Sequence, residues 1–133
     1  MRSGPSETSA PCWVSEMFID IHVHPAFYEP INGDGRRERM RHEILGIHKN
    51  GTAKLEHIFN QMRIAKLDLM CLHAQDYCIA EGIIPVSNDE IKQLVDLAPD
   101  RFVGFASVDP HDPGAWDKLE RAFGDLCLRG LNL

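Results

Sequence analysis

The sequence has no long apolar run, no closely paired cysteines and no dense basic segment, and each absence excludes a class of protein. A membrane-spanning helix needs roughly 18 or more consecutive apolar residues, and no such run is present. The four cysteines, Cys12, Cys71, Cys78 and Cys127, form no CxxC motif, which favours free thiols in a reducing, cytoplasmic compartment. A net charge of −6 argues against a nucleic-acid partner, because phosphate contacts need clustered Lys and Arg.

A glycine-rich phosphate loop and a secretory signal are also missing. The first absence argues against a nucleotide-binding protein. Residues 1–16 contain no apolar core segment of a signal peptide. They are rich in Ser, Pro, Gly and Thr, and they predict a disordered N-terminal extension. The chain of 133 residues, with 44% apolar and 26% charged residues, is long enough for one folded domain, which we place at residues 17–133.

The stretch Met17–Pro25 predicts the first strand, and the rest of the chain is organised around it. With a period of two residues, it divides into an apolar side and a polar side. The apolar side, which we expect to be buried, carries β-branched residues: Ile19, Ile21 and Val23. The polar side carries a carboxylate and two imidazoles: Asp20, His22 and His24. Pro25 lacks a backbone donor and ends the strand, so the two histidines lie at its carboxyl end.

The two histidines predict a metal site. Side chains two residues apart on a strand point to the same face, so His22 and His24 can reach a single divalent cation. Neutral imidazole is the commonest metal ligand in proteins. The alternative is a buried strand whose histidines are satisfied by ordinary hydrogen bonds. Two histidines and Asp20 in phase favour the metal site over that alternative.

Strand and helix patterns then alternate to the end of the chain. Apolar runs at 67–72, 101–108 and 128–133 predict three further strands. Residues with helical spacing predict four amphipathic helices: over 36–50, after an N-cap at Thr52, after a capping box of Ser87 and Glu90, and after an N-cap at Asp112. The last helix is expected to bury Trp116, Leu119, Phe123 and Leu126. This order is typical of βαβ units and a parallel α/β sheet, and it favours a barrel over an open sheet.

Ionisable residues follow the predicted strands. His73 ends the second strand and Asp109 the third. Sites in parallel α/β folds gather at the carboxyl ends of strands, so these two residues and Asp20 form a possible active-site face. The helix over 36–50 also carries a basic cluster, which is either a solvated surface or a site for an anionic substrate group: Arg36, Arg37, Arg39 and Arg41.

Three segments resemble one known family. Residues 20–25 (DIHVHP) resemble the first-strand motif of the amidohydrolase superfamily. Residues 101–110 (RFVGFASVDP) and 128–133 (LRGLNL) resemble the third and fourth strands of its amidohydrolase-related branch, which includes the aminocarboxymuconate-semialdehyde decarboxylase-like enzymes. The resemblance covers residues 17–133, and the three segments in this order are more specific than the HxH motif alone.

The resemblance implies the N-terminal half of a TIM-type (β/α)8 barrel that holds one divalent metal ion, usually zinc. In the family, the HxH pair supplies two ligands, here His22 and His24. Later strands supply further histidines and a late Asp that is a ligand or the acid/base. The implied reaction is decarboxylation or hydrolysis of a small carboxylate, lactone or amide.

The chain departs from the family pattern in its length. A complete barrel needs about 250 residues, so 133 residues provide about half, and the late Asp has no counterpart here. Catalytic residues therefore stay unknown. One interpretation is an enzyme represented by its N-terminal half, with a small-molecule substrate. The other is an inactive truncated product that acts, if at all, as a binding module. In either case the open strands predict a homo-oligomer or a self-associating fragment.

Overall fold

The computed structural model describes residues 16–46 and 51–133. The predicted disordered extension, residues 1–16, lies outside the described residues except for Glu16. No helix in the described part of the chain has both the length and the apolar content to cross a bilayer. Cys71, Cys78 and Cys127 are free thiols, as predicted.

The fold is built on a curled sheet of four parallel strands, as the repeated βαβ pattern predicts. The sheet order is β1-β2-β5-β6, and each strand pairs in parallel with its neighbours. The strands are β1 (Ile19–Val23), β2 (Leu69–His73), β5 (Phe102–Ser107) and β6 (Gly130–Asn132). This sheet, alternating with helices, is half of a TIM-type barrel, which confirms the predicted fold class.

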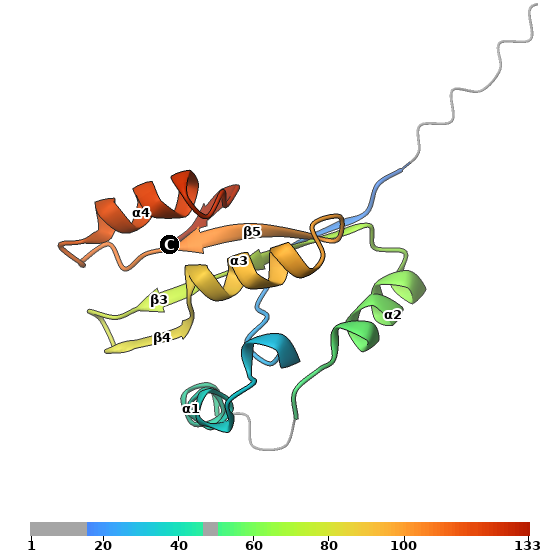
Figure 1. Cartoon of the computed structure of the whole chain (residues 1–133), viewed down its shortest axis with the longest axis horizontal. Helices are drawn as coiled ribbons and strands as arrows, with labels where there is room; N and C mark the ends of the chain where they lie inside the picture. The colour runs from blue at the N-terminus through green and yellow to red at the C-terminus, as the bar shows by residue number, and fades with distance from the viewer. Residues whose placement is uncertain (1–15, 47–50) are drawn as a thin grey trace, which may run out of the picture.

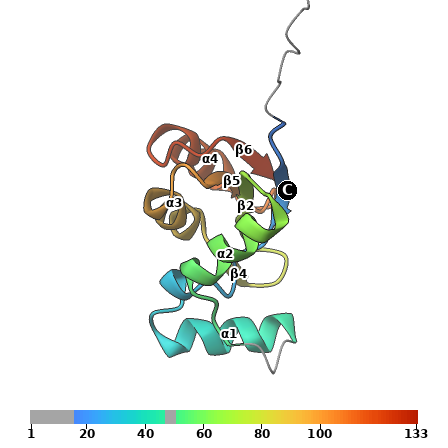
Figure 2. The ribbon, with the colours of Figure 1, turned by 90° about the vertical axis from the view of Figure 1, so that its right-hand side faces the viewer.

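Within residues 16–46 and 51–133, four helices and one short 3-10 turn connect the strands (Figure 1). They are η1 (Glu29–Ile31), α1 (Gly35–Leu45), α2 (Leu55–Ala65), α3 (Asn88–Leu97) and α4 (Ala115–Gly124). Helices α3 and α4 lie on the same side of the sheet (Figure 2). Met62, Leu72, Ile91, Leu94 and Phe102 fill the core between helices and sheet.

Gly104 sets the distance between β5 and α3. A Cβ atom at this position would lie 2.6 Å from a methyl carbon of Leu128 and 2.8 Å from one of Ile91. Side-chain atoms do not approach so closely, so only glycine lets the helix pack this near to the strand.

A small hairpin that the sequence analysis did not predict follows β2. Its strands, β3 (Gln75–Tyr77) and β4 (Ile83–Val86), are antiparallel. Gly82, in the turn between them, has a φ of 69°, a conformation that glycine adopts without strain. The hairpin therefore occupies the connection between β2 and α3, above the carboxyl end of β2.

The capping box of α3 is confirmed, but two predicted N-caps are wrong. The Ser87 side chain accepts from the backbone N–H of Glu90, and the Glu90 side chain accepts from that of Ser87. Helix α1 ends at Leu45, because Gly46 is left-handed with a φ of 63°, and the predicted end at Asn50 lies outside the described residues. The N-caps of α2 and α4 are Lys54 and Gly114 rather than Thr52 and Asp112, and neither makes a side-chain capping bond.

The predicted buried stripe of α4 is also wrong in part. Leu126 is buried, but Trp116 is 71% exposed and Phe123 is 45% exposed. The small side chain of Ala122 is the buried contact of this helix, so α4 packs through a narrower face than its apolar spacing indicates. Trp116, Leu119 and Phe123 instead line a shallow apolar hollow on the surface.

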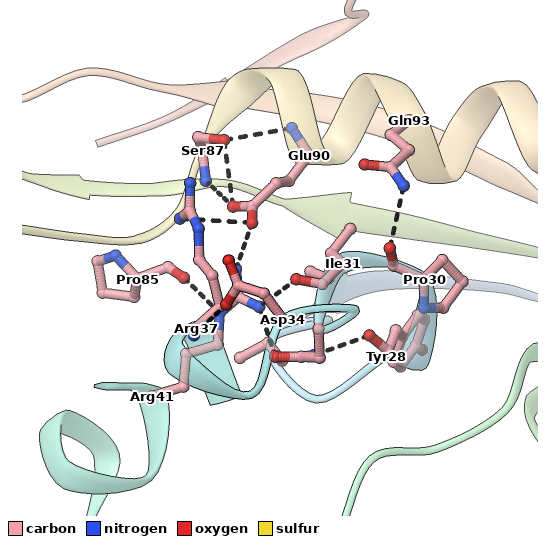
Figure 3. A network of polar contacts seen from close by, with 12 residues as sticks. Tyr28, Pro30, Ile31, Asp34, Arg37, Arg41, Pro85, Ser87, Glu90 and Gln93 are labelled. Atoms are coloured by element: carbon pink, nitrogen blue, oxygen red, sulfur yellow. Dashed lines mark hydrogen bonds and ion pairs between the residues drawn. The ribbon is translucent and has the colours of Figure 1, made fainter. Parts of the chain in front are cut away.

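The arginines of the basic cluster in α1 differ in burial, and Figure 3 shows two of them, Arg37 and Arg41. Arg36 and Arg39 are exposed. Arg41 is completely buried, and its guanidinium donates to the carbonyl oxygens of Ile31 and Pro85 and to the side chains of Asn32 and Glu90. For Arg41, both predicted interpretations are wrong, because it joins α1 to η1, β4 and α3 as a structural residue.

Candidate functional site

A register shift in β1 changes which of its side chains share a face. Asp20 pairs with Met70 and Val23 with Leu72, so three steps on β1 match two on β2. At this irregularity, the backbone N–H of His22 donates to the Asp20 carboxylate (3.1 Å). Such a bulge interrupts the two-residue alternation on which the predicted common face depended.

The burial of β1 differs from the prediction. Ile19 is 44% exposed and Ile21 is 71% exposed, so the expectation that the β-branched residues are buried is wrong for these two. Val23 does pack against the core. The physical reason is that β1 is an edge strand of the described sheet and has a neighbouring strand, β2, on one side only.

His22 and His24 lie together at the carboxyl end of β1. Both are exposed, and their Nε2 atoms are 2.9 Å apart. Their rings meet edge to face, with centroids separated by 4.6 Å. Partial burial of its ring lowers the pKa of His24, although the residue as a whole is exposed, and the nearby His22 and His73 lower it further. His24 therefore stays neutral, and available as a ligand, to a lower pH than an isolated imidazole.

His73 joins this pair from β2. Its ring centroid is 4.5 Å from that of His22 and 6.1 Å from that of His24. Its Nε2 lies 2.8 Å from the carbonyl oxygen of Ile21 on the neighbouring strand. The other face of the ring stacks on Phe105 of β5, with centroids 4.7 Å apart. The structure thus brings together three histidines that the sequence analysis placed at the ends of two different strands.

The His22–His24 pair fits a divalent ion after a small adjustment. Two imidazole nitrogens that share a tetrahedral zinc ion at bond lengths near 2.0–2.1 Å are separated by about 3.3 Å. The observed 2.9 Å requires the rings to open by a few tenths of an ångström, which exposed side chains can do. Within residues 16–46 and 51–133, no three His, Cys, Asp or Glu side chains are already arranged as a metal site.

Asp20 lies near Tyr28, on the side of β1 that Tyr28 occupies. Burial and the Asp20 charge together raise the pKa of Tyr28 to about 12. The Tyr28 hydroxyl donates to the sulfur of Met70, the residue in register with Asp20. Since residues in register point to the same side of a sheet, Asp20 faces the Tyr28 side of β1.

Asp109 is buried and engaged by backbone groups. One of its carboxylate oxygens accepts from the N–H groups of Ile79 and Ala80 (2.9 Å each), and the other accepts from His111 (2.9 Å). These bonds lower the pKa of Asp109. Asp109 therefore ties the end of β5 to the segment between β3 and β4.

A second polar cluster was not predicted from the sequence. The Lys118 ammonium contacts the carboxylates of Asp76 (2.8 Å) and Asp112 (2.6 Å) and lies 3.4 Å from the sulfur of Cys78. Burial opposes the charges, but the hydrogen bonds outweigh it: they lower the pKa of Asp76 and raise that of Lys118. No signal in the sequence joins these residues, because the hairpin and α4 meet only in the fold.

This cluster borders a cavity of about 190 Å³. Asp76 and Lys118 line it together with Ser87, Ser107 and the ion pair of Asp89 and Arg121. Each charged side chain that lines the cavity has an oppositely charged partner. These ion pairs therefore hold the hairpin, α3 and α4 together.

Comparison with known proteins agrees with the fold. No protein-family model and no curated protein matches the chain. Among solved structures, an uncharacterised TIM-barrel protein from Bordetella bronchiseptica aligns with a TM-score of 0.58 at 18% identity, over 89% of this chain and 43% of its own. The 5-carboxyvanillate decarboxylase of Sphingomonas paucimobilis aligns with a TM-score of 0.58 at 17% identity, over 86% and 42%. The 2,6-dihydroxybenzoate decarboxylase of Rhizobium gives 0.53 at 19%, over 87% and 38%.

These likenesses concern the fold: the chain corresponds to part of a TIM barrel. It spans less than half the length of each of these solved chains.

Proposed function

We propose that this chain is part of a metal-dependent decarboxylase or hydrolase of the amidohydrolase type, which acts on a small carboxylate, lactone or amide. The observation that carries the proposal is the placement of His22 and His24, 2.9 Å apart, at the carboxyl end of the first strand of a barrel-type sheet. Active sites of TIM barrels lie at this end. The sequence resemblance to the amidohydrolase-related branch supports the same function, and two of the structures with a similar fold are decarboxylases.

Within this function, His22 and His24 would hold a divalent ion, with zinc as our preferred candidate. Such an ion, when bound, polarises a carboxylate or carbonyl oxygen of the substrate. The histidines bind through neutral imidazole, and the low pKa of His24 favours that form. The exposed side chains of Ile19 and Ile21 provide apolar surface on the same strand.

The described carboxylates near the carboxyl ends of the strands are engaged by other groups, and Asp20 accepts from the backbone N–H of His22. Asp109 accepts three backbone hydrogen bonds, and Asp76 is paired with Lys118. In the proposed function, the proton is moved by a residue from a later barrel strand, so the chain alone should be a poor catalyst.

The test is a single-turnover assay with protein in excess. Zinc-loaded protein is incubated with 2,6-dihydroxybenzoate or 5-carboxyvanillate, and the decarboxylated product is measured by mass spectrometry. Product that depends on zinc and is lost in the His22→Ala/His24→Ala variant supports the enzyme. Product formation that is unchanged in that variant contradicts the proposed site.

A second candidate is a non-catalytic module that associates with itself. It is favoured by exposed apolar side chains on and directly before β1, where Met17 and Phe18 are 63% and 52% exposed. Surfaces of this kind mark protein contacts. Self-association of the chain that is reduced by Ile21→Lys, a change at an exposed apolar residue of β1, would favour this candidate.

A further inference from the structure

We propose that His73 is a third ligand of the divalent cation, through its Nδ1 atom, beside His22 and His24. The inference rests on the proposed function and deepens it, because the HxH motif assigns only the two histidines of β1. The observation that carries it is an unpartnered nitrogen: His73 is 5% exposed, and its Nδ1 is buried without a hydrogen-bond partner.

The hydrogen bond on the other side of the ring determines the tautomer. The His73 Nε2 lies 2.8 Å from the carbonyl oxygen of Ile21, and a carbonyl oxygen can only accept. Nε2 therefore carries the proton, and in the neutral ring Nδ1 has a free lone pair. Metal-binding histidines have this arrangement, in which the second ring nitrogen donates to a backbone carbonyl.

Buried acceptors without a partner are rare and unfavourable, because the group has lost its water without gaining a donor. A cation is one group that can occupy the free lone pair of Nδ1. The nearest neighbours of the ring are suited to the same cation, since the centroids of His22 and His24 lie 4.5 and 6.1 Å away.

The packing of β5 and β6 holds the His73 ring in place. Phe105 is in register with His73 and stacks on it, at an interplanar angle of 27°. Gly130 of β6 makes room for Phe105, because a Cβ atom there would lie 2.2 Å from the phenyl ring. The ring of His73 is thus fixed by a hydrogen bond on one strand and by a stacked ring on the other, as expected of a preorganised ligand.

Cation binding requires only the exposed histidines to move. His22 and His24 are directed at each other, so the three nitrogens do not yet surround a common point. Both side chains are exposed and can rotate without repacking the core, whereas His73 stays in position. Three imidazoles and one open coordination position form the ligand set of a catalytic zinc ion.

The test counts imidazole ligands and measures affinity in the whole chain. Zinc titration by calorimetry gives the affinity, and X-ray absorption of the zinc-loaded protein gives the number of bound imidazoles. His73→Gln is the informative variant, because its amide nitrogen can keep the bond to Ile21 while Nδ1 is removed. His57→Ala is the matched control, because His57 is an exposed histidine whose ring contacts Gln61.

We expect three imidazoles in the unchanged chain, two in His73→Gln, and an affinity that falls by more than about 100-fold, beyond the effect of losing an outer-shell partner. The His57→Ala variant should bind as the unchanged chain does. Two imidazoles in the unchanged chain, or unchanged affinity in His73→Gln, would overturn the assignment and leave the His22–His24 site intact. Failure of the unchanged chain to bind zinc would contradict the proposed function as well. The imidazole count in the unchanged chain needs no variant, so it decides even where His73→Gln folds poorly.

Discussion

Replacing Arg41 with methionine tests whether the buried arginine network holds the first helix to the barrel. Arg41 is completely buried and donates to the carbonyl oxygens of Ile31 (2.7 Å) and Pro85 (2.9 Å) and to the Glu90 carboxylate (2.6 Å). Methionine keeps most of the apolar length of the side chain but cannot donate. The variant therefore leaves two backbone carbonyl oxygens, the Asn32 side-chain oxygen and a carboxylate without this donor.

The expected loss follows from the burial of the ion pair. Removing one partner of a buried pair costs about 3–5 kcal/mol. Arg37 also lies within 3.4 Å of the Glu90 carboxylate, with a side chain that is 43% exposed, and it can compensate part of that charge. We therefore expect Arg41→Met to lower the free energy of unfolding by about 3 kcal/mol, a large share of the roughly 5–15 kcal/mol that typical domains have.

Urea unfolding followed by circular dichroism, at one fixed protein concentration, measures this loss. Arg39→Met is the matched control, because Arg39 is an exposed arginine of the same helix and should change the stability by less than about 0.5 kcal/mol. Glu90→Gln should cost less in the Arg41→Met background than in the unchanged chain, since the carboxylate no longer has its buried partner. A loss below about 1 kcal/mol in Arg41→Met, with additive effects in the double variant, would refute the reasoning.

Three further predictions concern other parts of the fold. The pKa of Asp109 is lowered in the folded chain, so its carboxylate stabilises the fold above its unfolded pKa of about 3.9, and this contribution is lost as the pH falls through the lower folded pKa. In Asp109→Asn, the free energy of unfolding should therefore fall less steeply at acid pH. The same variant should speed proteolysis of residues 75–86. Gly130→Ala should destabilise the chain by about 1–3 kcal/mol, because the added Cβ atom would collide with the Phe105 ring. Adding Phe105→Leu to this variant should recover part of the loss. Equal urea midpoints for Gly130→Ala and the unchanged chain would contradict this. Light scattering at micromolar concentration should detect self-association that Ile21→Lys reduces, whereas a monodisperse monomer would show that the exposed apolar residues of β1 have no such role.

The sequence predicts local features well where their causes are local. The Ser87 capping box depends on residues three apart and is confirmed. The parallel order of strands follows from the alternation of β and α patterns, and it is confirmed in the sheet. The position of His22 and His24 at the end of β1 follows from Pro25, which stops the strand.

Other features depend on partners far away in the chain and could not be predicted in this way. The register shift in β1 is set by its pairing with β2, about fifty residues later. The burial of Arg41 depends on carbonyl groups such as that of Pro85, which no periodicity reveals. The hairpin at 75–86 is short, and Pro85 within β4 weakens its strand signal.

The central claim is that the carboxyl ends of β1 and β2 bind a divalent cation through histidine, and calorimetric zinc titration of the whole chain tests it most directly. The account predicts one zinc site that is lost in His22→Ala/His24→Ala. Binding should also weaken as the pH falls below about 6.5, because protonated imidazole cannot bind a metal. The lowered pKa of His24 should shift its own part of that loss to lower pH. Zinc binding that is unchanged in the double variant, or that does not respond to pH between 7.5 and 5, would contradict the account.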